Sequence, residues 1–181
     1  MSADGAALRQ VLRPGDLALV NACGGGATDP VAGGPQPAAL AAALGLPAIA
    51  IERGRDPVLC LRERREAPEA ALLCIEEDPG RWLGAAEGSW SQALGDFQQA
   101  TVLLVAPDAS GRIGGAAAAS AALLRAAGVP LIGLVQSAGL WDGASRRQDG
   151  LPWAGQLGGG SDGLEELALA LRLRWQRLLS L

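Results

Sequence analysis

The sequence predicts an α/β domain of three layers, in which helices cover both faces of a mostly parallel sheet of five or six strands. Three observations support this prediction. Short apolar runs alternate with longer segments of helical character along the chain. The apolar runs are continuous, as is typical of strands that are buried on both faces. The helical segments are rich in Ala, whose small side chain lets a helix lie close to a sheet.

Six apolar runs are the predicted strands. Each is short, and Gly, Pro, Asn or Asp residues lie next to most of them, as expected where a chain turns at the edge of a sheet. The last run, LPWAGQL, is the least regular of the six. In chain order the predicted strands are residues 16–22, 47–52, 71–76, 101–106, 130–136 and 151–157.

Signals for the start and end of helices separate these strands. Asp56 and Asp78 are each followed by Pro, which is typical of an N-cap and a first helical turn. Gly128 precedes a strand and ends the helix before it. A hairpin through 58–75 is the alternative to the second helix. The predicted helices are residues 35–45, 57–67, 79–100 with a break near Gly88, 114–128, and a C-terminal helix.

The C-terminal helix is expected to start near Asp162, because Glu165 follows three positions later as in a capping box. One face of this helix is apolar. That face consists of Leu164, Leu167, Leu171, Trp175 and Leu178. Leu169 and Leu173 lie off it and are interpreted either as packing at its rim or as a contact in a homo-oligomer.

Composition excludes several chemistries. The chain contains no His and no Lys, and all fifteen of its basic residues are Arg. It therefore has no Ser-His-Asp triad, no imidazole metal ligand, no Schiff-base lysine and no phosphate-loop lysine. Proton transfer would fall to Asp, Glu, Cys or water.

The length of 181 residues predicts a single α/β domain over residues 1–181. The net charge of −4 argues against a nucleic-acid partner, and no apolar run has the length of a membrane span. The N-terminus lacks the features of a signal peptide, so a cytoplasmic location is expected. Three cysteines without a CxxC pair predict free thiols and no metal site.

Two segments of the chain share one design. Residues 16–52 and 101–136 each run from a strand through a loop with Asp and Gly-Gly into an Ala-rich helix and a second strand. Ligands of parallel sheets bind outside the carboxyl ends of the strands, and a glycine loop entering a helix suits an anion. The alternative is that the glycines only allow tight turns. The candidate ligand-binding residues here are Gly24, Gly25, Gly26, Thr28, Asp29, Ser110 and Arg112.

A second candidate segment is the long loop 137–153. Long loops in compact domains are often functional, adjacent arginines can hold phosphate or carboxylate, and a Trp can stack on a ring. The alternative is a solvated loop held in place by one Trp. Its candidate ligand-binding residues are Ser137, Trp141, Arg146 and Arg147.

Two further groups of residues are candidate sites. The acidic run Glu76, Glu77 and Asp78 could hold Mg²⁺, but such a run more often caps a helix and faces water. Cys23 precedes the first glycine loop, where a helix N-terminus would lower the pKa of a thiol, yet no His is present to act as its base. The sequence does not identify a cofactor.

Parts of the chain resemble the family of dethiobiotin synthetase and the cobyrinic-acid amidating ligases, which have a phosphate-loop fold. DLALVNACGGG resembles the family's strand and V-E-G-A-G-G turn, and residues 101–137 are similar to its later strand, loop, helix and strand. LPWAGQL is similar to the family's next strand. The resemblance covers about half of the chain, roughly residues 16–26 and 101–157.

The chain departs from this family where ATP chemistry is carried out. It has no phosphate loop with its Lys, Asn21 stands where the family has Glu, and Ser137 stands where the family's adenine-reading Asn is expected. The resemblance therefore implies a Rossmann-like or P-loop-like fold without ATP-dependent ligation.

Three hypotheses about function follow. The favoured one is a degenerate, non-catalytic nucleotide-fold protein that binds a small anionic ligand or a protein partner at the carboxyl ends of the strands. The first alternative is a metal-independent enzyme with Asp29 or Asp108 as general base and Arg112 as an electrostatic clamp. The second is a structural subunit that assembles through its C-terminal helix.

Overall fold

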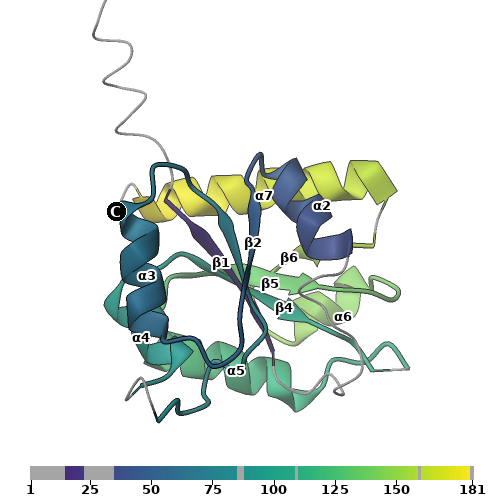
Figure 1. The fold of residues 1–181 in the computed structure, drawn as a ribbon. Helices are drawn as coiled ribbons and strands as arrows, with labels where there is room; N and C mark the ends of the chain where they lie inside the picture. Colours follow the sequence, from purple (N-terminus) through teal and green to yellow (C-terminus); the bar gives the residue numbers. More distant parts are fainter. Residues whose placement is uncertain (1–14, 23–34, 85–87, 109, 159, 180–181) are drawn as a thin grey trace, which may run out of the picture.

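A computed structural model describes residues 15–22, 35–84, 88–108, 110–158 and 160–179 (Figure 1). Six parallel strands form one sheet in the order β2-β3-β1-β4-β5-β6, with helices on both faces. The predicted three-layer α/β fold is thereby confirmed, and the sheet is parallel throughout. The strands are β1 Leu17–Asn21, β2 Ala48–Ile51, β3 Leu72–Ile75, β4 Thr101–Val105, β5 Leu131–Gln136 and β6 Trp153–Gln156.

Each predicted strand is present. The central strands are buried, as continuous apolar runs between two layers of helices are, whereas the edge strands β2 and β6 are partly exposed. The four residues of β3 and the five of β4 are all buried. The helices are α2 Pro35–Ala43, α3 Pro57–Glu66, α4 Trp90–Asp96, α5 Gly115–Ala126, α6 Gly143–Gln148 and α7 Gly160–Leu179.

Two apolar cores lie on the two faces of the sheet, and Figure 1 shows the helices that cover these faces. On one face α2 and α7 cover alternate residues of the strands, including Leu17, Leu19 and Leu104. On the other face α3, α4 and α5 cover the residues between them, including Ala18 and Leu103. The period of two along each strand therefore sends successive side chains into different cores.

The connections diverge at the centre of the sheet. From β1 the chain passes through α2 on one face to β2 at one edge, whereas from β4 it passes through α5 on the other face to β5. β1 and β4 are neighbours in the sheet. Their carboxyl ends are therefore a topological switch point, where open parallel sheets bind ligands.

The helix α3 is confirmed, and the alternative hairpin is wrong. Asp56 is its N-cap, and one carboxylate oxygen accepts hydrogen bonds from the backbone N–H groups of Val58 (2.9 Å) and Leu59 (3.0 Å). Pro57 occupies the first turn, where no N–H donor is needed. The Asp-Pro pair therefore acts here as predicted.

The same pair at Asp78 does not start a helix, so the prediction of a helix over 79–100 is wrong in its first half. The Asp78 carboxylate accepts from the N–H of Gly80 (2.8 Å) and closes a turn. α4 begins only at Trp90, where Ser89 and Gln92 form a capping box. Glycine two residues after Asp78 favours a turn over a helix.

Three predictions for the C-terminal third are also corrected. Residues 137–153 contain the short helix α6, capped by Asp142 through the N–H groups of Ala144 and Ser145. α7 begins at Gly160, so Asp162 lies in its first turn and is not the N-cap. Leu178 is 37% exposed and does not continue the buried face that Leu167, Leu171 and Trp175 form.

Candidate functional site

The carboxyl ends of four strands meet at one edge of the sheet. The register pairs Asn21 of β1 with Leu104 of β4, Val105 with Gln136 of β5, and Gln136 with Gln156 of β6. The segments that follow β1 and β4 therefore leave from neighbouring positions at the same edge. The first glycine loop lies outside the described residues, and with it lie five candidate residues: Gly24, Gly25, Gly26, Thr28 and Asp29.

The loop after β4 is organised by Asp108. Its Oδ1 accepts hydrogen bonds from the Ser110 N–H (2.8 Å), the Ser110 hydroxyl (2.7 Å) and the Arg112 N–H (2.9 Å). The Ser110 hydroxyl and then the Arg112 N–H are the main reasons why the pKa of Asp108 is lowered. A carboxylate stabilised in this way is a weak base, which argues against Asp108 as a general base.

This loop leads into an open helix N-terminus. Gly114 is the N-cap of α5, and no side chain caps the helix. The N–H groups of Gly115 and Ala116 have no hydrogen-bond acceptor among the described residues. By contrast, Asp56, Ser89 and Asp142 cap α3, α4 and α6. The start of α5 therefore offers free donors and the positive end of a helix dipole.

Arg146 lies beside this loop in a buried position. Its side chain comes from α6, and the residue is only 7% exposed. Nε donates to Oε1 of Gln136 (3.1 Å), and Nη2 donates to the carbonyl oxygen of Gly111 (3.2 Å). The guanidinium also lies over the Trp153 ring, 5.2 Å from its centroid. Arg146 thus connects the end of β5, the loop before α5 and the start of β6.

Gln136 fixes the segment after β5. It is fully buried, and its Nε2 donates to the carbonyls of Ala138 (2.7 Å) and Leu140 (3.1 Å). Ser137 is also buried, and its N–H donates to the Val105 carbonyl (2.9 Å). The segment is therefore held to the sheet by backbone and side-chain hydrogen bonds.

The two tryptophans of the long loop contact each other. Trp141 meets Trp153 edge to face, with ring centroids 6.0 Å apart. Trp153 is buried and donates from Nε1 to both carboxylate oxygens of Asp149 (3.0 and 2.8 Å). Trp141 keeps 36% of its surface exposed. An aromatic ring is thus held at the surface against Trp153.

The two adjacent arginines do not form one clamp. Arg146 is buried, whereas Arg147 is exposed on the same short helix. Consecutive residues of a helix point about 100° apart, so their guanidinium groups diverge.

Arg112 is exposed on the loop before α5. The candidate residues Ser110, Arg112, Ser137, Trp141 and Arg146 therefore gather around the ends of β4 and β5.

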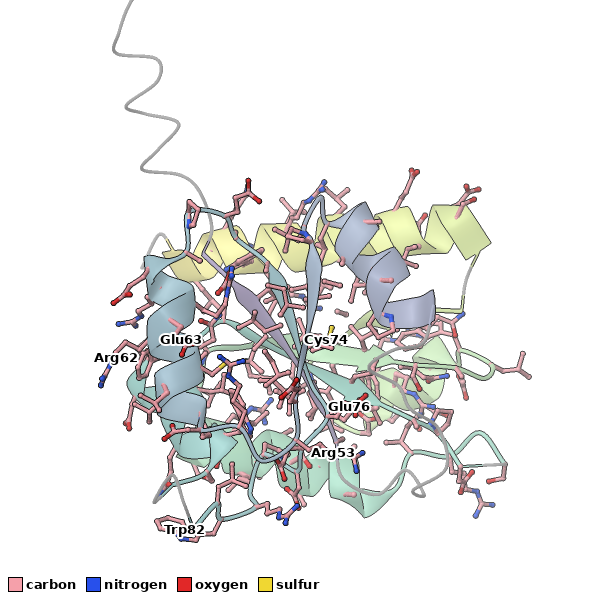
Figure 2. All side chains as sticks on the ribbon, in the orientation of Figure 1. Arg53, Arg62, Glu63, Cys74, Glu76 and Trp82 are labelled. Carbon is pink, nitrogen blue, oxygen red and sulfur yellow. The ribbon has the colours of Figure 1, made fainter. Side chains whose placement is uncertain are left out.

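Glu76 and Glu77 of the acidic run after β3 interact with other residues of this chain. Glu77 is buried and accepts from the Gly54 N–H (2.7 Å) and from Nη1 of Arg81 (2.8 Å). Glu76 lies 3.6 Å from Nε of Arg53, and Figure 2 labels both residues. No group of three or more potential ligands in the described part of the chain could hold a metal ion. This run therefore shapes the edge of the sheet near β2 and β3.

The described cysteines are buried in the two cores. Burial raises the pKa of the Cys60 thiol, and it raises the pKa of Cys74 to about 11. A thiol with a raised pKa is a poor nucleophile at neutral pH. Cys23 lies outside the described residues.

Two contacts of the site escaped the sequence analysis. The Gly111 carbonyl receives the Arg146 side chain, and Asp149 anchors Trp153. The first is a backbone contact between segments distant in the sequence and has no sequence signal. Asp149-Gly150 is a recognisable turn pair between a helix and a strand, and it could have indicated that Asp149 is fixed.

No protein-family model matches this chain, and no curated protein matches its sequence. The resemblance to the dethiobiotin synthetase family therefore stays a prediction. Within the described residues, no helix combines the length and the apolar character that crossing a membrane requires.

Proposed function

We propose that this chain binds a small anion, such as phosphate or a carboxylate, at the start of α5 and does not catalyse a reaction there. The observation that carries the proposal is the uncapped N-terminus of α5 at the carboxyl end of β4. A bound anion would accept hydrogen bonds from the N–H groups of Gly115 and Ala116, which have no acceptor among the described residues.

The surroundings support an anion over a cation. The helix dipole places positive potential at this end, and Arg112 adds an exposed positive charge two residues before the N-cap. The chain as a whole has a net charge of −4, so this local positive character is not a general property of its surface. The site also adjoins the switch point between β1 and β4.

A binding role is favoured over catalysis by the residues available. The chain has no His or Lys, and the lowered pKa of Asp108 makes it a weak base. In this proposal the chain is a degenerate member of the nucleotide-binding folds that it resembles. A protein partner that presents a carboxylate or a phosphate would use the same donors.

A substitution at the N-cap tests the proposal. Gly114 has φ −69° and ψ 158°, and a Cβ added there meets no atom within 4 Å. Gly114→Asp should therefore be tolerated and should cap α5, stabilising it by roughly 0.5–1 kcal/mol. The same carboxylate would occupy the anion site. We expect Gly114→Asp to abolish phosphate binding while it raises the melting temperature.

Two matched variants separate capping from charge. Gly114→Asn caps the helix without a charge, and Gly114→Ala adds only a Cβ. In isothermal titration with inorganic phosphate, Gly114→Ala should bind like the unmodified chain, Gly114→Asn more weakly, and Gly114→Asp not at all. Phosphate at about one hundred times its Kd should stabilise the unmodified chain by about 2.7 kcal/mol. Unaltered phosphate binding by Gly114→Asp, or no binding by the unmodified chain, would reject the proposal.

A further inference from the structure

The outer side of α7 carries two exposed leucines. The helix packs against the sheet through Leu167, Leu171 and Trp175, and with α2 it covers one face of the sheet (Figure 1). Leu169 and Leu173 lie off this buried side and keep 56% and 52% of their surface exposed. Residues four positions apart lie one above the other on a helix, so these two leucines form one small apolar patch.

Polar residues extend this patch in both directions along α7. The patch belongs to a row of residues separated alternately by four and three positions, which is the spacing of a coiled-coil seam. The row consists of Asp162, Glu166, Leu169, Leu173 and Gln176. Its two leucines point about 160° away from the centre of the buried side, so the row runs along the outer side of the helix. α7 therefore has a second possible packing surface that is apolar only at its middle.

Charge is separated along this outer side. Glu165 and Glu166 are exposed in the N-terminal half of α7, and Arg172 and Arg177 are exposed in its C-terminal half. At least six positions separate each Glu from either Arg, whereas an ion pair within a helix needs a separation of three or four. The side chains of Glu165 and Glu166 have no hydrogen bond or ion pair to any described residue. These two carboxylates are thus available to a partner.

An antiparallel second copy of α7 complements this pattern. If the two helices meet midway between Leu169 and Leu173, Leu169 of each copy lies opposite Leu173 of the other. Glu166 of each copy then lies beside Arg177 of the other, because the two residues are nearly equidistant from the midpoint and lie on the same side of the seam. A parallel pair would instead place Glu166 beside Glu166, which is repulsive. The charges therefore favour one orientation.

We propose that the chain forms a two-fold symmetric homodimer through the outer side of α7, with the two copies of this helix antiparallel. The interface is apolar at its centre and charged at its ends, as protein interfaces commonly are. Only two leucines come from each copy, so the dimer is weak and forms in the micromolar range of concentration. The competing explanation is that the charges only complement the dipole of α7 and that the leucines stay in contact with water.

This surface is separate from the proposed anion site. α5 covers the opposite face of the sheet from α7. Dimerisation through α7 would therefore leave the start of α5 accessible, and neither proposal depends on the other.

The mass in solution tests dimerisation. Sedimentation equilibrium between about 1 μM and about 1 mM should show the mass rising from 18.3 kDa toward twice that value. Leu169→Glu places two charges at the centre of the dimer and should weaken association about tenfold or more. Leu59→Glu is the matched control, because Leu59 is 51% exposed on α3, on the other face of the sheet. The control should associate like the unmodified chain.

A charge swap tests the antiparallel orientation. At low ionic strength, Glu166→Arg and Arg177→Glu should each weaken association, because each variant brings like charges together at both ends of the interface. The double variant Glu166→Arg/Arg177→Glu should dimerise like the unmodified chain, since the antiparallel contact joins these two positions. An equimolar mixture of the two single variants should also dimerise.

Each result decides the inference. A mass of 18.3 kDa at every concentration would reject it. Equal weakening by Leu169→Glu and Leu59→Glu would indicate a general effect of charge and overturn it, as would a double variant that associates no better than the single ones. If circular dichroism shows that Leu169→Glu does not fold, Leu169→Ala takes its place, because Ala keeps the helix and removes most of the apolar contact.

Discussion

Gly95 lies where α4 meets the C-terminal end of α5. A Cβ added to Gly95 would be 1.9 Å from the carbonyl oxygen of Ala127, a backbone atom that cannot rotate away. The absence of a side chain therefore permits the close contact between the two helices. In the sequence, this glycine is indistinguishable from one that merely weakens a helix.

Gly95→Ala should destabilise the protein by about 1–3 kcal/mol or more, because the two helices must move apart. Gly163→Ala is the matched control, since Gly163 also lies inside a helix and a Cβ there meets no atom within 4 Å. The control should be neutral or stabilising by up to about 1 kcal/mol. Urea denaturation measures both, and equal effects would contradict the steric explanation.

The sequence does not indicate which of the adjacent residues Arg146 and Arg147 is buried. A helix as short as α6, with few apolar residues, has no periodic pattern that indicates which side faces the sheet. The burial of Arg146 depends on Trp153 and Gln136, which come from two different strands. Candidate residues at strand ends could be identified from the sequence, but the contacts between them could not be predicted.

Among the secondary-structure elements, two similar Asp-Pro signals for a helix start lead to different local structures. Asp56-Pro57 caps α3, but Asp78-Pro79 is followed by Gly80 and closes only a turn. The true start of α4 was present in the sequence as Ser89 with Gln92 three positions later, which is a capping box. The strands were easier to predict, because a buried parallel strand has one continuous apolar pattern.

Ser89→Ala should destabilise the protein by about 1 kcal/mol, because it removes the N-cap of α4 and the hydroxyl contact with Ser91 (3.0 Å). Asp78→Ala is the comparison, since Asp78 is exposed and caps only a turn. Its effect should stay within about 0.5 kcal/mol. Guanidinium denaturation followed by tryptophan fluorescence measures both, and the reverse order would contradict the assignment of the cap.

At the scale of the whole molecule, buried thiols make the free energy of unfolding depend on pH in the alkaline range. Burial raises the pKa of Cys74 from its ordinary value of 9.0 to about 11, so the folded chain holds this proton more tightly than the unfolded chain. Between these values the unfolded state binds fewer protons, and the free energy of unfolding falls as pH rises. Below pH 9 the full contribution of the neutral thiol is present.

The free energy of unfolding should therefore decline by up to about 1.4 kcal/mol per pH unit between pH 9 and 11 on account of Cys74. Cys74→Ala should make this decline shallower, although it lowers the stability at neutral pH by leaving a small cavity. Urea titrations at several pH values compare the two slopes. Identical slopes would show that ionisation of Cys74 is not linked to unfolding.

The position of α7 in the chain has a consequence for biosynthesis. Leu17 and Leu19 of β1 are among the earliest described core residues to be translated, yet α7, which supplies Leu167, Leu171 and Trp175 to the same core, is translated after all six strands. Until these residues leave the ribosome, that side of the sheet presents leucines and valines to solvent or to a chaperone. A stalled nascent chain ending before residue 160 should thus bind chaperones more strongly than the released protein does.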